Sequence, residues 1–224
     1  MNRVLFWDFD GTLVYCHHLW SGSVLKVLQE NSVNATLQDV RPYMAEGYPW
    51  DLKNDHSELK GEAWWEYLYR KFSRVYQAFG IAPDTAHRLG PYTRHLILDP
   101  EKYHLYDDTL TILKESLKRG WRNILVSNNY PELRQTVDVL GLTPYFSEFV
   151  ISGEIGFDKP QPEIFEYALD IAKNPECCYM IGDNPHADIE GAINAGIPAI
   201  LVHRAVRTNA VHTFETLTEL LSVL

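Results

Sequence analysis

The chain has 224 residues, of which 46% are hydrophobic, enough for one large domain or for a core with a small companion domain. Its formal net charge of -10 argues against a surface for nucleic acid or an anionic membrane, although a metal ion and one lysine can still favour a phosphate substrate locally. No apolar run is long enough to span a membrane, no signal peptide precedes Asp8, and the three cysteines match neither a disulfide framework nor a zinc site, so we expect a cytoplasmic protein.

The first predicted element is a short buried strand at residues 4–7, which ends in charged residues. The side chains of Asp8 and Asp10 would point to the same side of an extended backbone, and Gly11 then permits a turn. The same residues would also suit an ordinary turn after a strand. However, two carboxylates at the end of a buried strand are costly unless a cation lies between them, and Mg2+ prefers such oxygen ligands.

Residues from about 17 to 95 show helical patterns with breaks and no convincing strand, and we interpret residues 15–99 as a helical insertion. Apolar residues at helical spacing favour helices near residues 24–28 and 37–44, before a break at residues 47–50. The strongest helical pattern covers residues 62–79, and Asp84 could cap the helix after it.

Aromatic residues of the insertion allow two interpretations. They could line a substrate pocket, or they could simply form the core of the insertion, which is the commoner role of such a stripe. His17 and His18 lie where the insertion begins and could contact substrate or be ordinary exposed residues. The aromatic residues in question are Trp20, Trp50, Trp64 and Trp65.

Strands and helices alternate after Asp99-Pro100. The predicted strands are 123–127, 149–151, 177–181 and 198–202, and the predicted helices are 108–120, 131–141, 162–171, 187–195 and 214–221. This alternation predicts an α/β fold, a Rossmann-like doubly wound parallel sheet covered on both faces. Ligands bind beyond the carboxyl ends of such strands, where Asp8, Ser127 and Asp183 all fall.

Two further stretches carry groups suited to phosphate binding. Ser127 and Asn128 follow a predicted strand, where a hydroxyl and backbone N–H groups can bind phosphate oxygens or form an ordinary polar turn. Lys159 lies beside Pro160 and Pro162, which would stiffen its loop. A fixed lysine can offset the charge of both a carboxylate and a phosphate, although most lysines are solvated at the surface.

The last stretch contains Gly182-Asp183 and, five residues later, Asp188. Gly182 permits close packing, and the Asp183 carboxylate could complete a set of oxygen ligands for a metal. Asp188 would either support the metal site through hydrogen bonds or lie in the first turn of the next helix.

These four stretches resemble, in order, the four motifs of the haloacid dehalogenase (HAD)-like hydrolase superfamily. The resemblance rests on Asp8-Phe-Asp-Gly-Thr12, on the strand that ends at Ser127, on Lys159-Pro-Gln-Pro162, and on Gly182-Asp183. It covers residues 1–14 and 100–224, which we expect to form a discontinuous HAD-like core. Residues 15–99 resemble the small helical (C1-type) caps of the superfamily in position and helical character.

The resemblance implies a covalent mechanism. Asp8 would be the nucleophile that forms an aspartyl-phosphate, and Asp10 would be the general acid and base. The cofactor would be Mg2+, held by the side chains of Asp8 and Asp183 and by the Asp10 carbonyl. The phosphoryl oxygens would be held by Ser127, Asn128 and Lys159.

The expected function is therefore that of an Mg2+-dependent phosphatase acting on a small phosphorylated metabolite, with no nucleic-acid or membrane partner. Dehalogenation is disfavoured, because the dehalogenase branch of the superfamily typically lacks the second aspartate, which is present here as Asp10. Two alternatives stay open: a phosphomutase of the same superfamily, and a non-catalytic protein that binds a phosphorylated ligand. The sequence indicates neither the individual substrate nor the oligomeric state.

Overall fold

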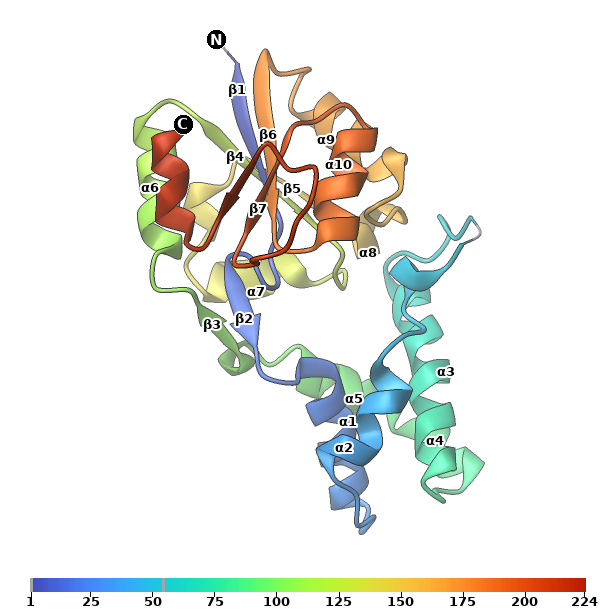
Figure 1. The fold of residues 1–224 in the computed structure, drawn as a ribbon. Helices are drawn as coiled ribbons and strands as arrows, with labels where there is room; N and C mark the ends of the chain where they lie inside the picture. Colours follow the sequence, from blue (N-terminus) through green and yellow to red (C-terminus); the bar gives the residue numbers. More distant parts are fainter. Residues whose placement is uncertain (1, 54) are drawn as a thin grey trace.

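The computed structural model describes residues 2–53 and 55–224, and a six-stranded sheet lies at its centre (Figure 1). The strand order is β5-β4-β1-β6-β7-β8, and every neighbouring pair runs parallel. This arrangement confirms the predicted Rossmann-like α/β class. The strands are β1 (Arg3–Trp7), β4 (Arg122–Ser127), β5 (Glu148–Ile151), β6 (Cys177–Gly182), β7 (Ala199–Val202) and β8 (His212–Phe214).

Helices cover both faces of this sheet, which explains why strands such as β1 and β7 carry buried apolar residues without alternation. On β1, Leu5 and Trp7 face one apolar cluster, whereas Val4 and Phe6 face the other. The first cluster includes residues of α6 (Thr109–Lys118), α7 (Leu133–Val139) and η6 (Leu217–Ser222). The second includes residues of α9 (Pro162–Ile171), η5 (Pro185–Glu190) and α10 (Gly191–Asn194).

The helical insertion lies beyond one end of the sheet, below it in Figure 1. Its main helices are α1 (Leu19–Glu30), α2 (Leu37–Val40), α3 (Glu62–Ala78), α4 (Pro83–Arg88) and α5 (Gly90–Ile97). The short turns η1 (Arg41–Met44) and η2 (Pro49–Asp51) link α2 toward α3. No helix in the described ranges combines the length and apolar character needed to cross a bilayer.

Two short antiparallel strands, β2 (Val14–Cys16) and β3 (Tyr103–Leu105), connect the insertion to the sheet. The sequence analysis predicted neither strand, and β2 includes Tyr15 and Cys16, the first two residues of the segment interpreted as helical. Three residues are too few to show a period-two pattern, and their pairing depends on a partner almost 90 residues away in sequence, at Tyr103–Leu105. The division into 1–14 with 100–224 and 15–99 stays a proposal, since β2 crosses its first boundary.

Helix ends differ from the predictions in several places. The predicted helix at 214–221 is instead the end of strand β8 followed by η6, which the capping box of Thr216 and Glu219 starts. The helix expected at 187–195 begins earlier, as the π-helical turn η5 at Pro185. Asp84 lies inside the first turn of α4, not at its cap.

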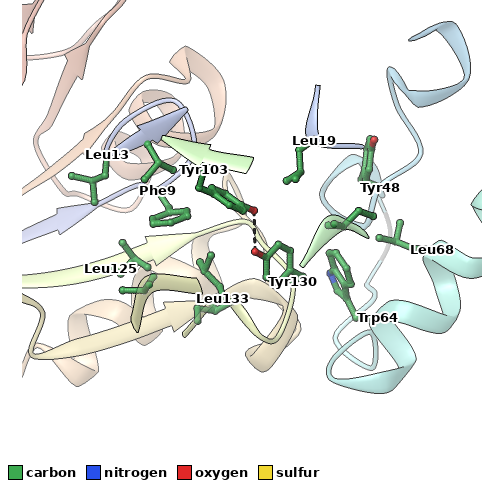
Figure 2. Close-up of a cluster of buried hydrophobic side chains, with 14 of the residues drawn as sticks. Phe9, Leu13, Leu19, Tyr48, Trp64, Leu68, Tyr103, Leu125, Tyr130 and Leu133 are labelled. Atoms are coloured by element: carbon green, nitrogen blue, oxygen red, sulfur yellow. Dashed lines mark hydrogen bonds between the residues drawn. The ribbon is translucent and has the colours of Figure 1, made fainter. Parts of the chain in front are cut away.

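One apolar cluster continues from the sheet into the insertion (Figure 2). Phe9 and Leu133 lie on the side of the sheet, and Trp64 and Leu68 lie on the side of the insertion. Between them Tyr103 and Tyr130 share a hydrogen bond of 2.9 Å. Because buried apolar surface connects the two parts, the hydrophobic effect holds the insertion against the sheet.

Polar contacts reinforce this junction around Glu132, at the start of α7. Its carboxylate accepts hydrogen bonds from Trp65 Nε1 (2.8 Å) and from the Arg94 guanidinium, which also pairs with Glu62 and lies over the Trp65 ring. Glu132 therefore ties α3 and α5 to the helical layer of the sheet.

A second polar contact joins residues 56–61 of the insertion to the core. His56 Nε2 lies 2.9 Å from Asp158 Oδ2, and both side chains are buried. The Gly61 N–H donates to the Gly153 carbonyl at 2.8 Å. The insertion is thus fixed to the core at Glu132 and again at Gly153 and Asp158.

Replacing Glu132 with alanine should lower the free energy of unfolding by about 2 kcal/mol, because it leaves Trp65 Nε1 without its acceptor and removes one carboxylate from Arg94. Denaturant unfolding of the purified variant measures this loss. Glu166→Ala, an exposed glutamate on α9, is the matched control and should unfold like the wild type. Equal stability of both variants would show that the Glu132 contacts contribute nothing.

Candidate active site

Asp8 lies at the carboxyl end of β1, in the middle of the sheet. The neighbours β4 and β6 end at Ser127 and Gly182, so the loops after all three strands meet at one edge. Asp8 is 8% exposed, its backbone N–H donates to the Ile181 carbonyl at 2.9 Å, and Thr12 Oγ1 lies 3.3 Å from Asp8 Oδ2. The Asp8 carboxylate is thus held firmly at the sheet edge.

Lys159 is buried and contacts two carboxylates at once. Its Nζ lies 2.7 Å from Asp8 Oδ1 and 2.6 Å from Asp188 Oδ1. Burial opposes the charge, but the Asp188 and Asp8 carboxylates outweigh it and raise the pKa of Lys159. The structure therefore excludes the interpretation of Lys159 as a solvated surface lysine.

Asn128, predicted to bind phosphate, is engaged with the loop that carries Lys159. Its Nδ2 donates to the Lys159 carbonyl at 2.7 Å, and its Oδ1 accepts from the Lys159 N–H at 2.6 Å. In this geometry Asn128 positions the lysine, while Ser127 lies buried beside it at the end of β4.

Asp10 lies two residues after Asp8 and has different partners. Asn129 Nδ2 donates to Asp10 Oδ2 at 2.6 Å, and Cys16 Sγ lies 3.8 Å from Asp10 Oδ1. Burial and, next, the Asp8 carboxylate raise the pKa of Asp10 to about 7. A carboxyl group with such a pKa can both donate and accept a proton near neutral pH. Asn129 was not identified from the sequence, because only its contact with Asp10 distinguishes it from a turn residue.

Three buried carboxylates could hold a cation. One oxygen each of Asp8, Asp183 and Asp188 lies within 4.8 Å of the others. Hard carboxylate oxygens at this spacing fit Mg2+. The sequence had placed the side chains of Asp8 and Asp183 in the metal site, and the structure brings these two together. The Asp10 side chain is outside this group and points to Asn129.

Arg204 contacts the same site and was missed in the sequence. Its Nη2 and Nε lie 2.6 and 3.0 Å from Asp183 Oδ2. Burial and the nearby Asp8 raise the pKa of Asp183, and Arg204 opposes this increase. Arg204 follows β7 by two residues, so its place after a predicted strand was the available signal.

Asp188 has the helical position considered for it, and its role in a metal site stays a prediction. It lies in the first turn of η5, accepts the Asn184 N–H at 2.9 Å, and pairs with Lys159. Gly182 makes this placement possible, because a Cβ there would lie 2.2 Å from the Asp188 side chain. Asp188 thus supports Lys159 and is also one of the three carboxylates that could hold a cation.

A cavity of about 760 Å3 opens between the sheet edge and the insertion. Asp10 and Asp183 line it from the core, and Trp20 and Trp50 line it from the insertion. A smaller adjoining cavity of about 330 Å3 reaches Asp8 and Lys159, and Trp50 borders both.

The aromatic residues of the insertion thus divide between the two interpretations. Trp64 and Trp65 are buried in the apolar cluster, whereas Trp20 and Trp50 contribute to the cavity wall. His18 also lines this cavity, but the exposed His17 is absent from the walls of the described cavities.

Comparison with known proteins agrees with this geometry. A curated phosphoserine phosphatase from Thermus thermophilus is 33% identical over 178 residues, covering 71% of this chain and 70% of its own. The pyrimidine 5'-nucleotidase YjjG from Escherichia coli is 30% identical over 206 residues, covering 86% of this chain and 82% of its own.

Solved structures share the fold. The HAD-hydrolase YfnB from Bacillus subtilis, bound to magnesium, superposes with a TM-score of 0.77 at 20% identity, covering 99% of this chain and 98% of its own. The haloacid dehalogenase-like hydrolase family profile matches residues 3–196, which include all four predicted motifs. The chain therefore belongs to the haloacid dehalogenase-like hydrolase family.

Proposed function

We propose that this protein is an Mg2+-dependent phosphatase that hydrolyses a small phosphorylated metabolite through an aspartyl-phosphate. The observation that carries the proposal is the pair of carboxylates at one strand end, the buried Asp8 on the Lys159 ammonium and the half-buried Asp10 on Asn129. The Asp8 carboxylate lies 2.7 Å from the Lys159 ammonium, which suits a nucleophile, and the pKa of Asp10 is raised to about 7, which suits a proton carrier.

The first step is in-line attack of an Asp8 carboxylate oxygen on phosphorus, which breaks the bond to the leaving oxygen. The Asp10 carboxyl donates its proton to that oxygen, so the leaving group departs as a neutral alcohol. Lys159 offsets the charge that gathers on the phosphoryl oxygens, and Ser127 and the backbone around Asn128 are placed to bind them.

In the second step a water molecule attacks the phosphorus of the aspartyl-phosphate. Asp10, now a carboxylate, accepts a proton from that water, and the bond to the Asp8 oxygen breaks. Inorganic phosphate leaves, and both aspartates return to their starting states. Asn129 keeps the Asp10 carboxyl directed at the same point in both steps.

The metal would be held by the Asp8 and Asp183 carboxylates, with the Asp10 carbonyl as a further oxygen ligand. When bound, Mg2+ supplies positive charge that offsets the phosphate and orients it toward Asp8. The charges of Lys159 and Arg204, which contact these carboxylates, make the site less repulsive to a phosphate before any metal binds.

The names of the curated relatives support a small phosphorylated substrate, since phosphoserine and pyrimidine nucleotides are both small phosphomonoesters.

We also propose that residues 15–99 form a cap domain over a core made of residues 1–14 and 100–224. The phosphomutase and the non-catalytic binding protein remain the alternatives. Release of inorganic phosphate from substrate separates hydrolysis from both, because a mutase retains the phosphoryl group on sugar and a binding protein releases none.

Phosphate release should require Mg2+ and stop in excess chelator, because without a cation the carboxylate cluster repels an anionic substrate. The measurement is phosphate release after metal removal verified by elemental analysis, followed by addition of Mg2+. Recovery upon addition is the control for irreversible damage. Full activity in the verified metal-free protein would contradict the proposed metal dependence.

Asp8→Asn should lower kcat at least about 1,000-fold, because an amide is a poor nucleophile and a weak metal ligand. Asp107→Asn is the matched control, since Asp107 is exposed and lies outside the cavities described above. Circular dichroism of both variants checks that the fold is intact. Near-native turnover by folded Asp8→Asn protein would rule out the covalent mechanism.

A further inference from the structure

We infer that the leaving group of the substrate carries a flat ring with hydrogen-bond acceptors, as the nucleoside of a nucleoside monophosphate does, and is not a compact aliphatic alcohol. This inference rests on the phosphatase function proposed above and names the substrate class of the same site. It depends on the wall of the cavity that the insertion supplies.

The cavity is much larger than a phosphate requires. Its volume of about 760 Å3 lies within the range of roughly 300–1,000 Å3 that is usual for sites of small organic ligands. The reacting groups Asp10 and Asp183 line only the core side. The remaining space, toward α1 and η1, is therefore available to the leaving group.

An aromatic wall forms part of this space and consists of Trp20, Tyr48 and Trp50. Tyr48 and Trp50 are stacked, with ring centroids 4.8 Å apart and planes at 6°, and Trp20 meets both edge-on at 5.3 and 6.2 Å. The buried Trp64 supports Trp20 and Trp50 from behind, with centroids at 6.2 and 6.4 Å.

Such a packed wall favours a flat ligand. Its rings are already fixed by one another, so a ligand ring that packs on them costs little side-chain entropy. Aromatic rings also add favourable stacking energy with a conjugated ligand ring, beyond the burial of surface. A short aliphatic leaving group would leave most of this wall without a partner.

The charge of the cavity indicates which groups the ring carries. Arg41 lines the cavity from η1, where its Nη2 lies 3.2 and 3.4 Å from the two ring nitrogens of His18. Within residues 2–53 and 55–224, no carboxylate forms an ion pair with Arg41. Its free N–H groups suit the carbonyl or anionic acceptors of a ligand.

The cavity also disfavours an amino-acid leaving group. Among the described residues that line it, the only carboxylates are Asp10 and Asp183, and both belong to the reaction centre. Within the described ranges the insertion contributes no carboxylate to this wall. Its Asp51 lines the smaller adjoining cavity, where Asp51 Oδ2 already accepts the N–H groups of Gly47 and Tyr48. An acceptor-bearing ring therefore fits the cavity better than a zwitterion does.

Equilibrium binding to the Asp8→Asn protein with Mg2+, measured by calorimetry, tests the inference without turnover. The probes are uridine 5'-monophosphate, phenyl phosphate, which has a ring but no ring acceptors, and phosphoserine. We expect uridine 5'-monophosphate to bind at least about tenfold more tightly than phosphoserine, with phenyl phosphate between them.

Two substitutions in the Asp8→Asn protein separate the contribution of the ring to binding from the contribution of its hydrogen-bond acceptors. Trp50→Leu should weaken the binding of uridine 5'-monophosphate and of phenyl phosphate by about tenfold each. It should weaken the binding of phosphoserine much less. Arg41 is exposed, so Arg41→Gln should leave the fold intact. It should weaken the binding of uridine 5'-monophosphate several-fold more than the binding of phenyl phosphate. The matched controls are the exposed Tyr92→Leu and Arg70→Gln, which lie outside the cavity and should bind all three probes like the parent.

The inference is overturned if phosphoserine binds as tightly as uridine 5'-monophosphate, or if Arg41→Gln weakens all probes equally. Phosphate release from acetyl phosphate by the wild type tests the proposed function separately, because this substrate has no ring. If the protein prefers ring-bearing probes but releases no phosphate, the proposed phosphatase function is wrong and the inferred binding site for a ring is retained. If the protein releases phosphate but shows no preference for ring-bearing probes, the proposed phosphatase function is retained and the inferred substrate class is wrong.

Discussion

The organisation of the site depends on one buried ammonium group. Lys159 lies between the carboxylates of Asp8 and Asp188, and without it two negative charges would face each other at the end of a buried strand. Much of the surrounding structure keeps it there: Asn128 holds its backbone on both sides, and Gly182 leaves room for Asp188. The position of the proposed nucleophile is thus fixed by residues from four separate loops, which meet only because the strands that precede them are parallel neighbours.

The sequence predicted those features that local chemistry determines. A strand buried on both faces must be apolar throughout, so β1, β4, β6 and β7 could be recognised, together with the polar residues that follow them. Asp8, Ser127 and Asp183 stand at predictable places for this reason. The resemblance to the HAD-like superfamily then linked the stretches in order, and the family match confirms it.

Features that depend on distant partners could not be predicted in this way. Asn129 donates a hydrogen bond to Asp10 across 119 residues of sequence, and Arg204 donates one to Asp183 across 21 residues. The sequence around Asn129 and around Arg204 does not differ from that of an ordinary polar turn. The strands β2 and β3 were missed because three residues carry no periodic signal. The division of the tryptophans between core and cavity wall likewise depends on packing that helical spacing alone does not resolve.

The pairing of β2 with β3 has a consequence for how such chains diversify. Because Val14 lies opposite Leu105, the chain leaves and re-enters the core at adjacent points, and the six-stranded sheet is complete without the segment in between. The intervening segment can therefore change in length or be exchanged for another without altering the order of the strands. A family built on this plan can acquire new substrates by replacing one contiguous stretch of sequence while its reacting groups stay where they are.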